Sequence, residues 1–287
     1  MHLTLPDGRL LDLSRPLIVG VLNLTPDSFS DGGAYPNTAK AVASALRMIA
    51  QGAAVIDIGG ESTRPGAERV PVREQIGRVQ EVIETLRQRT RVPISIDTTR
   101  HTVAKAAFEA GASIINDVSA GRDDDDRLFL LAAREGMPII LTHMLDQPAT
   151  MQAEPTYEDV VAEVRQFLVD RAAAAQVAGV PRSQIVLDPG IGFGKTIDHN
   201  LTLLAHLDTF VSTGYPVMLG TSRKRFLGEI TGTNEPTERD PATAATSALA
   251  AEAGVHMVRV HDVLTNRHAV DIAYAVRRAR RAFTASS

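Results

Sequence analysis

The 287-residue chain contains no cysteine and no tryptophan. Without cysteine it can form no disulfide, no zinc site with thiolate ligands and no thiol nucleophile, and this composition is consistent with a cytoplasmic protein. Aromatic residues make up only 4 % of the chain, which argues against the stacking surfaces that bind single-stranded nucleic acid. The formal net charge is only −4, so we do not expect nucleic acid as a partner.

Long hydrophobic runs are also absent. No apolar stretch approaches the roughly 20 residues that span a bilayer. Residues 1–7 have neither the basic nor the apolar part of a signal peptide. The hydrophobic fraction of 44 % is that of a globular protein with a substantial core. Since no membrane span and no signal peptide is recognised, the chain is predicted to be a cytoplasmic protein without membrane contact.

Short apolar runs, rich in valine and isoleucine, alternate with longer amphipathic segments. Each short run is almost continuously apolar, which is typical of a strand buried on both faces of a parallel sheet. Eight runs are predicted as strands, at 17–21, 54–58, 93–96, 113–115, 138–141, 184–187, 216–219 and 256–260. Helices are predicted after them, at 38–51, 72–90, 102–110, 128–135, 157–178, 201–210, 223–231 with 241–253, and 265–281.

A glycine recurs between the end of a predicted helix and the next strand, where the left-handed conformation closes a helix. The six glycines are Gly52, Gly111, Gly136, Gly179, Gly214 and Gly254. They indicate one repeated strand–helix unit, and eight units in about 250 residues are typical of a closed barrel. We therefore predict an α/β fold in which residues 1–287 form a single domain, a (β/α)8 TIM barrel. A doubly wound open sheet is the alternative.

The turn sequence at 6–9 lies between the apolar segments 3–5 and 10–13. It predicts a short N-terminal β-hairpin that covers the N-terminal mouth of the barrel.

Polar residues follow nearly every predicted strand. In a barrel all strand ends meet at one face, where the active sites of this fold lie. A polar group at the end of a buried strand costs free energy unless it is paired. For Asp57 or Asp117 taken alone, a structural role as a turn cap or as the partner of a neighbouring group is as good an explanation as a role in binding. The whole ring, however, indicates a ligand site. The ring comprises Asn23, Asp57, Asp97, Asn116, Asp117, His143, Asp188, Ser222, Lys224, Arg259 and His261.

The residue types suggest what this ring binds. Asp97, Asn116 and Asp188 offer mixed donors and acceptors that suit the polar edge of a flat heterocycle. Lys224, Arg259 and His261 suit an anion such as phosphate, which this fold often holds after its last two strands. The run 220–224 leads into a helix whose backbone N–H groups can hold a second anion. Two polar, glycine-rich loops, 25–35 and 59–66, are interpreted as lids or anion clamps.

These segments, in order, resemble the signatures of the dihydropteroate synthase family. The resembling segments are 23–33, 57–66, 95–98, 116–118, 142–144 with 148–152, 188–195, 222–228 and 259–263. A single Asp-Pro-Gly would be weak support, but an ordered set with one member near each strand end is specific.

The resemblance implies a reaction and its ligands. In that family, 6-hydroxymethyl-7,8-dihydropterin diphosphate and 4-aminobenzoate give 7,8-dihydropteroate and pyrophosphate, in folate biosynthesis. The implied pterin and diphosphate residues are Thr63, Asp97, Asn116, Asp188, Lys224, Arg259 and His261, of which Asp97, Lys224, Arg259 and His261 are the expected catalytic residues. The implied aminobenzoate residues are Phe29, Arg64, Pro65, Phe193 and Ser222. Asn23 is the implied ligand of Mg²⁺, and a homodimer is expected because the relatives are homodimers.

We expect catalysis by positioning and electrostatics. Mg²⁺, Arg259 and His261 would neutralise the leaving pyrophosphate, on an SN1-like path. One alternative is a pterin-dependent methyltransferase, which gives no reason for the sequences at 63–66 and 222–224. The other is a catalytically silent paralogue that binds pterin or pairs with an active subunit. Substitutions among the diphosphate or loop residues would indicate such a paralogue, and none is evident.

Overall fold

Strands and helices alternate along the chain, which the computed structural model describes at residues 1–24, 37–61, 69–145 and 155–285. The eight predicted runs are all strands. They are β3 (Leu17–Asn23), β4 (Val55–Gly59), β5 (Ile94–Asp97), β6 (Ile114–Asp117), β7 (Ile139–Thr142), β8 (Ile185–Asp188), β9 (Met218–Leu219) and β10 (Met257–Val260). Their side chains are almost all buried, because one face lines the barrel and the other packs against helices.

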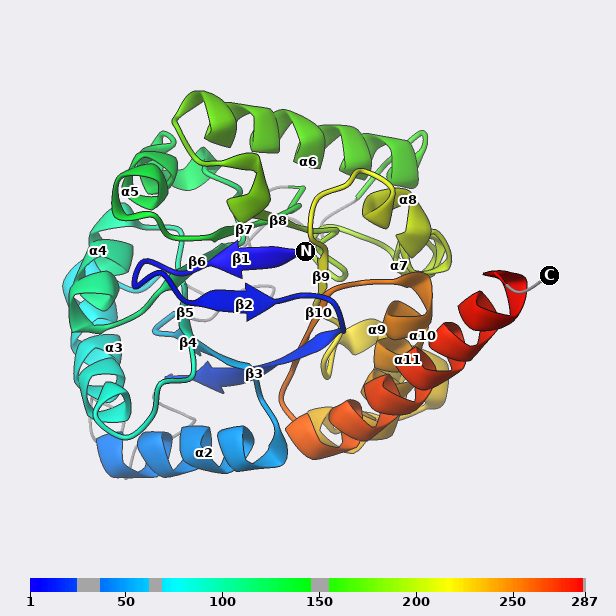
Figure 1. Cartoon of the computed structure of the whole chain (residues 1–287), viewed down its shortest axis with the longest axis horizontal. Coiled ribbons are helices and arrows are strands. Elements are labelled where there is room, and N and C mark those ends of the chain that lie inside the picture. Colours follow the sequence, from blue (N-terminus) through cyan, green and yellow to red (C-terminus); the bar gives the residue numbers. More distant parts are fainter. Residues whose placement is uncertain (25–36, 62–68, 146–154, 286–287) are drawn as a thin grey trace.

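Helices follow the strands and surround them (Figure 1). They are α2 (Thr38–Gln51), α3 (Val72–Arg87), α4 (His101–Ala110), α5 (Arg127–Glu135), α6 (Val160–Val177), α7 (Ile197–Ala205), α8 (Leu207–Val211), α9 (Arg225–Thr231), α10 (Asp240–Ala253) and α11 (Val263–Ala285). Short 3-10 turns lie at Arg122–Asp124, Arg182–Gln184 and Pro236–Arg239.

The prediction of one helix at 201–210 is wrong. Two helices, α7 and α8, meet there at His206, which leaves the helical region with φ −120° and ψ 34°. The His206 ring nitrogen Nδ1 lies 2.8 Å from the Thr202 carbonyl oxygen, so the side chain turns back onto the helix that it ends. Hydrophobic periodicity continues across such a break and does not reveal it.

The strands form one parallel sheet in the order β8-β7-β6-β5-β4-β3-β10-β9. The sheet closes on itself where Leu187, in β8, forms a bridge with Val217, just before β9. The Leu187 N–H also donates to the Pro216 carbonyl at 2.9 Å. The predicted (β/α)8 TIM barrel is therefore confirmed, and the open sheet is excluded.

The six predicted glycines all adopt positive φ, from 65° at Gly136 to 115° at Gly111. Each lies between the end of a helix and the next strand, as expected for a left-handed closing residue.

An antiparallel hairpin, β1 (His2–Thr4) with β2 (Leu10–Asp12), confirms the N-terminal prediction. In Figure 1 it lies across the end of the barrel. Its leucines pack on a layer of inward side chains from the strands, and full burial of one such leucine stabilises the fold by roughly 1.5–3 kcal/mol. This cluster comprises Leu3, Leu5, Leu13, Leu17, Val19, Val55, Ile114, Ile140, Val186, Met218 and Met257. With the N-terminal mouth filled, the carboxyl ends of the strands form the open face.

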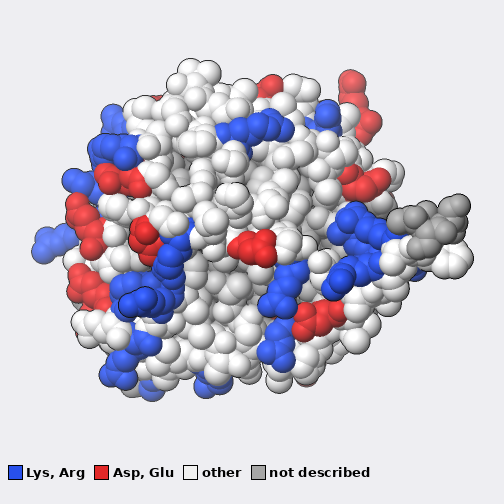
Figure 2. Space-filling view, in the orientation of Figure 1, with Lys and Arg blue, Asp and Glu red and all other residues white. Residues whose placement is uncertain are grey.

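Charged side chains on the hairpin face are of mixed sign. Figure 2 shows basic and acidic groups interspersed around the rim, with basic groups gathered over α11. None of the helices in the described part of the chain has the length and apolarity to cross a bilayer.

Candidate active site

Asp57, in the middle of β4, is the centre of a buried polar network. Its side chain is fully buried and accepts three hydrogen bonds from other strands. The donors are Ser95 Oγ at 2.5 Å, Arg259 Nε at 2.6 Å and Asn116 Nδ2 at 3.0 Å. Asp57 therefore fixes two of the predicted site residues, Asn116 and Arg259, relative to each other.

Asp97, at the end of β5, contacts the same guanidinium. Its Oδ2 accepts from Arg259 Nη2 at 2.7 Å, whereas its Oδ1 is buried and has no partner among the described residues. The amide oxygen of Asn116 is likewise buried and unpartnered there. Leaving a buried acceptor unsatisfied costs about 1–3 kcal/mol. Two such oxygens on neighbouring strands are the acceptors that a ligand with N–H donors would satisfy.

The protonation of Asp97 and Arg259 is governed by their burial and by their charged neighbours. Burial raises the pKa of Asp97 to about 7, against the lowering effect of Arg259 and with a further raising effect of Asp57. Burial alone would lower the pKa of Arg259, but Asp57 and Asp97 hold it above its ordinary value. The guanidinium therefore stays charged, and Asp97 gains or loses its proton near neutrality.

Asp188 and Lys224 provide an oppositely charged pair from β8 and the loop after β9. Asp188 Oδ1 accepts from the Gly190 N–H at 2.8 Å. Lys224 Nζ donates to the Ile191 carbonyl and lies 4.3 Å from the centre of the Phe193 ring. Burial lowers the pKa of Lys224 to about 8, opposed by Asp188, and burial raises the pKa of Asp188.

Gly220 lies between these groups. A Cβ at this position would lie 3.7 Å from Asp188 Oδ2 and 3.9 Å from Arg259 Cβ. The two sides of the site, Asp188 with Lys224 and Asp97 with Arg259, therefore approach each other around a small residue.

Ser222 and His261 meet at the ends of the last two strands. Ser222 Oγ lies 2.9 Å from His261 Nδ1 and accepts from the His261 N–H at 3.1 Å. His261 and Asn23 also line a cavity of about 490 Å³ between α2, the end of β3 and the loop after β10, with Arg47 and Asp262. Asn23, at the end of β3, thus lies on the same side of the site as His261.

Asp117 has a local role. Its carboxylate accepts from Ser119 N and Oγ, at 2.8 and 2.7 Å, and from the Gly121 N–H at 2.5 Å. It caps the turn after β6, which is the simpler of the two explanations that the sequence allowed.

Lys195 and His143 form a buried pair that sequence reasoning missed. Lys195 Nζ lies 2.9 Å from His143 Nδ1, behind the turn that carries Ile191 and Phe193. The one available signal was a lysine directly after three closely spaced glycines.

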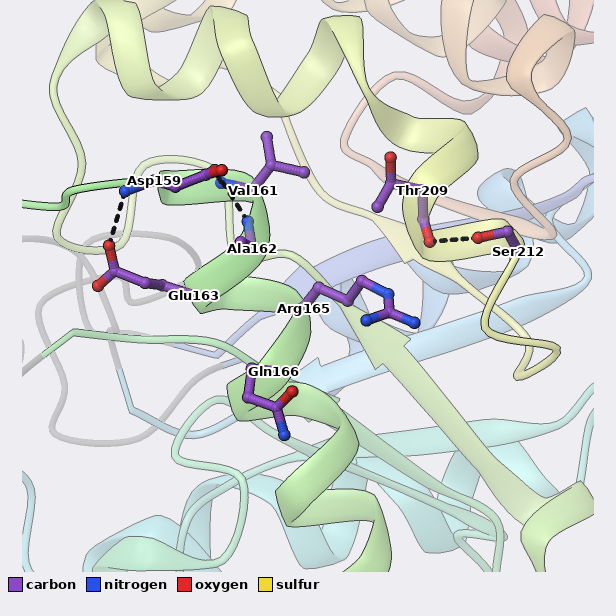
Figure 3. Close-up of a pocket in the computed structure, with 8 residues that line it drawn as sticks. All are labelled: Asp159, Val161, Ala162, Glu163, Arg165, Gln166, Thr209 and Ser212. Atoms are coloured by element: carbon purple, nitrogen blue, oxygen red, sulfur yellow. Dashed lines mark hydrogen bonds between the residues drawn. The ribbon is translucent and has the colours of Figure 1, made fainter.

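A second hollow lies on the outer helical layer, between α6 and α8 (Figure 3). Several of its polar groups already have local partners. Asp159 N–H donates to Glu163, and Ser212 Oγ donates to the Thr209 carbonyl at 2.8 Å. Since no predicted site residue lines it, the strand ends remain the candidate active site.

The structure thus gathers nine predicted site residues at the carboxyl ends of the strands or in the loops directly after them. They are Asn23, Asp97, Asn116, Asp188, Phe193, Ser222, Lys224, Arg259 and His261. The other four, Phe29, Thr63, Arg64 and Pro65, lie outside the described residues.

Comparison with known proteins gives a consistent family. A model of pterin binding enzymes matches residues 19–261. The dihydropteroate synthase of Escherichia coli (strain K12) is 44 % identical over 256 residues, which cover 89 % of this chain and 90 % of that protein.

Solved structures agree. Yersinia pestis dihydropteroate synthase, solved with a sulfonamide drug, has a TM-score of 0.90 at 42 % identity and covers 96 % of this chain and 99 % of that one. The Xanthomonas albilineans enzyme with 4-aminobenzoic acid has a TM-score of 0.89 at 45 % identity, covering 96 % and 97 %. That enzyme has also been solved with 7,8-dihydropteroate. With a family model over most of its length and relatives above 40 % identity, the chain belongs to the pterin-binding enzymes, and among them to the dihydropteroate synthases.

Proposed function

We propose that this chain condenses 6-hydroxymethyl-7,8-dihydropterin diphosphate with 4-aminobenzoate to give 7,8-dihydropteroate and pyrophosphate. The observation that carries the proposal is a pair of buried acceptors, Asp97 Oδ1 and Asn116 Oδ1, which have no partner in the described part of the chain and lie beside the fixed guanidinium of Arg259. A pterin supplies ring N–H and amino donors for such acceptors. The Xanthomonas complexes with 4-aminobenzoic acid and 7,8-dihydropteroate support the same ligands here.

In this proposal the two sides of the site bind different edges of the pterin. Asp97 and Asn116 accept hydrogen bonds at one edge, and Asp188 with Lys224 binds another. Arg259 flanks the ring, because Asp57 and Asp97 hold its guanidinium at both Nε and Nη2. The remaining side belongs to the diphosphate, with Arg259, His261 and Thr63.

The aminobenzoate would lie against Phe193 and Ser222, on the side where Lys224 contacts the Phe193 ring. Phe29, Arg64 and Pro65 complete this part of the proposal, from segments outside the described residues.

The proposed reaction breaks the C–O bond between the pterin methylene and the diphosphate and forms a C–N bond to the arylamine, which then loses a proton. The electron-rich dihydropterin can delocalise positive charge on the methylene, so a strong base near the amine is not required. Arg259 and His261 stabilise the charge that develops on the leaving pyrophosphate. An SN1-like path predicts positional isotope exchange in the diphosphate, and its absence under conditions that favour return would contradict this path.

Mg²⁺ fits the residues as an ion that arrives with the diphosphate. Asn23 offers one amide oxygen close to Asp97. A Cβ built on Gly59 would lie 3.7 Å from Asn23 Oδ1 and 3.5 Å from Asp97 Cβ, so Gly59 lies between these two side chains. Among the described residues no three His, Asp or Glu side chains cluster as a metal cage. Mg²⁺ commonly uses few protein ligands together with substrate phosphates and water. When bound, it would neutralise charge on the leaving group, with Asn23 as its protein ligand.

The proposal is tested with the purified chain, the pterin diphosphate, 4-aminobenzoate and Mg²⁺. Equal amounts of dihydropteroate and pyrophosphate are expected. Turnover of methyl-tetrahydrofolate instead would favour the methyltransferase. Failure to rescue a bacterial strain that lacks the synthase would favour the silent paralogue.

We further propose a cytoplasmic homodimer. The absence of cysteine supports the compartment. Exposed apolar side chains on α10 and α11 support the dimer: Leu249 is 57 % exposed, Ile272 70 % and Val276 44 %. Exposed apolar side chains on two helices that pack against each other are typical of a surface that another subunit covers.

A further inference from the structure

Lys195 is a buried lysine with an unusual set of partners. It is only 3 % exposed, and Nζ lies 2.9 Å from the Gly190 carbonyl, 3.0 Å from the Phe193 carbonyl and 2.9 Å from His143 Nδ1. It forms no ion pair with a described carboxylate. Burial of an amine without a counter-charge costs free energy. Burial lowers the pKa of Lys195 well below its ordinary value, and three contacts in hydrogen-bonding geometry hold the amine in place, which indicates a specific use of this side chain.

His143 is itself held firmly in place, so it anchors Lys195. It follows β7, and its N–H donates to the Asp188 carbonyl at 3.0 Å. Its ring packs edge-on against Phe167, with the centroids 4.8 Å apart. Lys195 therefore joins the end of β7 to the turn after β8.

That turn forms the surroundings of Lys224. The two carbonyls that Lys195 holds, at Gly190 and Phe193, flank Ile191, whose own carbonyl accepts from Lys224. Two positions in this turn have no room for a side chain. A Cβ at Gly190 would lie 1.8 Å from the His143 carbonyl oxygen, and one at Gly192 would lie 3.0 Å from Lys224 Cδ.

Tyr157 provides a second anchor for the same turn. Its hydroxyl donates to the Gly194 carbonyl at 2.9 Å, one residue before Lys195.

We propose that Lys195 is a positioning residue, which ties the turn 190–193 to His143 and thereby sets the Ile191 carbonyl and the Phe193 ring around Lys224. The groups that it positions, Lys224 and Phe193, are among those proposed to bind the two substrates, so this inference rests on the proposed function. Lys195 itself contacts neither substrate.

The test is a double-mutant cycle with Lys195→Met and Lys224→Met. Lys195→Met is expected to raise KM for the pterin diphosphate and for 4-aminobenzoate by about tenfold, with kcat changed less than about threefold. In the Lys224→Met background, Lys195→Met should weaken pterin diphosphate binding by less than about threefold, because the group that it positions is gone. Binding is measured by calorimetry without 4-aminobenzoate, and Lys105→Met, at an exposed surface lysine, serves as the matched control.

A purely structural role gives a different result. Lys195→Met would then lower Tm while KM stayed at the wild-type value, or its effect would be the same in both backgrounds, and either outcome overturns the proposal. Tyr157→Phe removes one hydroxyl from the same turn and is expected to raise both KM values by about threefold. If Lys195→Met does not fold, the cycle between Tyr157→Phe and Lys224→Met decides in its place.

The wild-type assay separates the two levels of inference. Wild-type chain that makes no dihydropteroate contradicts the proposed function. Active wild type, with both turn variants binding substrate as wild type does, contradicts only the role of Lys195.

Discussion

At the scale of single residues, the site is organised by groups that would not touch the substrate. Asp57 uses both carboxylate oxygens on Ser95, Asn116 and Arg259, so neither oxygen is left without a protein partner. Asp97 and Asn116 each keep one oxygen without a described partner. The division between residues that hold the site and residues that face a ligand thus follows from counting the hydrogen bonds of each oxygen.

Asp188→Asn tests the pterin assignment. The substitution keeps the shape of the side chain but removes the charge that complements Lys224 and the donors of the pterin. We expect kcat/KM to fall at least tenfold, about 1.4 kcal/mol of transition-state binding. Steady-state kinetics check this, with Asp170→Asn on the exposed face of α6 as control. Near-wild-type kinetics for Asp188→Asn would remove Asp188 from the site.

The pH dependence of kcat/KM for the pterin diphosphate should have two limbs. Asp97, with its pKa raised to about 7 by burial, becomes protonated and loses its charge as the pH falls through that value. Lys224, with its pKa lowered to about 8 by burial, loses its charge as the pH rises through that value. The maximum is therefore expected between about 7 and 8. In Lys224→Arg the alkaline limb should move to higher pH, because a guanidinium does not titrate there; an unmoved limb assigns it to another group.

Asn23→Ala tests the metal proposal. Removal of Mg²⁺ with excess EDTA is expected to abolish turnover, since the charge of the leaving pyrophosphate is then poorly neutralised. For Asn23→Ala, the Mg²⁺ concentration that gives half-maximal activity should rise several-fold, because one ligand is lost. A titration of Mg²⁺ at saturating substrates measures this shift, and an unchanged midpoint would show that Asn23 is not a ligand.

At the scale of elements, two glycines with nearly the same φ angle offer a matched comparison. Gly190 has φ 68° and Gly136 has φ 65°. A Cβ at Gly136 meets nothing within 4 Å, whereas a Cβ at Gly190 would collide with the His143 carbonyl. Gly136→Ala is expected to cost about 1–2 kcal/mol for the left-handed conformation alone, and Gly190→Ala considerably more. Urea unfolding measures both, and equal losses would contradict the close approach of the His143 carbonyl to Gly190.

Elements were the part of the fold that the sequence predicted best. Buried strands such as 138–141 are continuous apolar runs, and closing glycines such as Gly52 lie where a helix must end. The break at His206 was missed because a local side-chain bond causes it, without proline or glycine. Strand β9 is only two residues long, shorter than the apolar run that predicted it.

The candidate site was predictable to a smaller extent. Strand-end position and residue type identified Asp97, Asn116, Asp188 and Arg259 as a group. Neither could say that Asp57 holds Arg259, a contact across 202 residues, because such pairing depends on β10, the last strand, lying beside β3, the first strand of the barrel. The Lys195–His143 contact was hidden for another reason: the two residues follow the neighbouring strands β7 and β8, but their contact depends on the conformation of the turn after β8.

At the scale of the whole molecule, the proposed dimer is open to a direct test. Ile272 is 70 % exposed on α11, beside Val276 one turn further along. Sedimentation of the wild-type chain is expected to give twice the monomer mass, and Ile272→Glu the monomer mass, because a charge would be buried without a partner. Lys105→Glu, at an exposed position of α4, should leave the mass at the wild-type value. A wild-type monomer at micromolar concentration would contradict the proposal.

The bridge between Leu187 and Val217 has a consequence for how substrate binding and stability are connected. The barrel wall is held at this point by far fewer backbone hydrogen bonds than between β3 and β4, so it is the seam of the cylinder. Asp188 lies on one side of this seam, and Lys224 follows β9 on the other. A pterin held by both residues would join the two edges as a non-covalent cross-link. The substrate would then form part of the wall that encloses it, and the emptied enzyme should exchange its amide hydrogens fastest along this line.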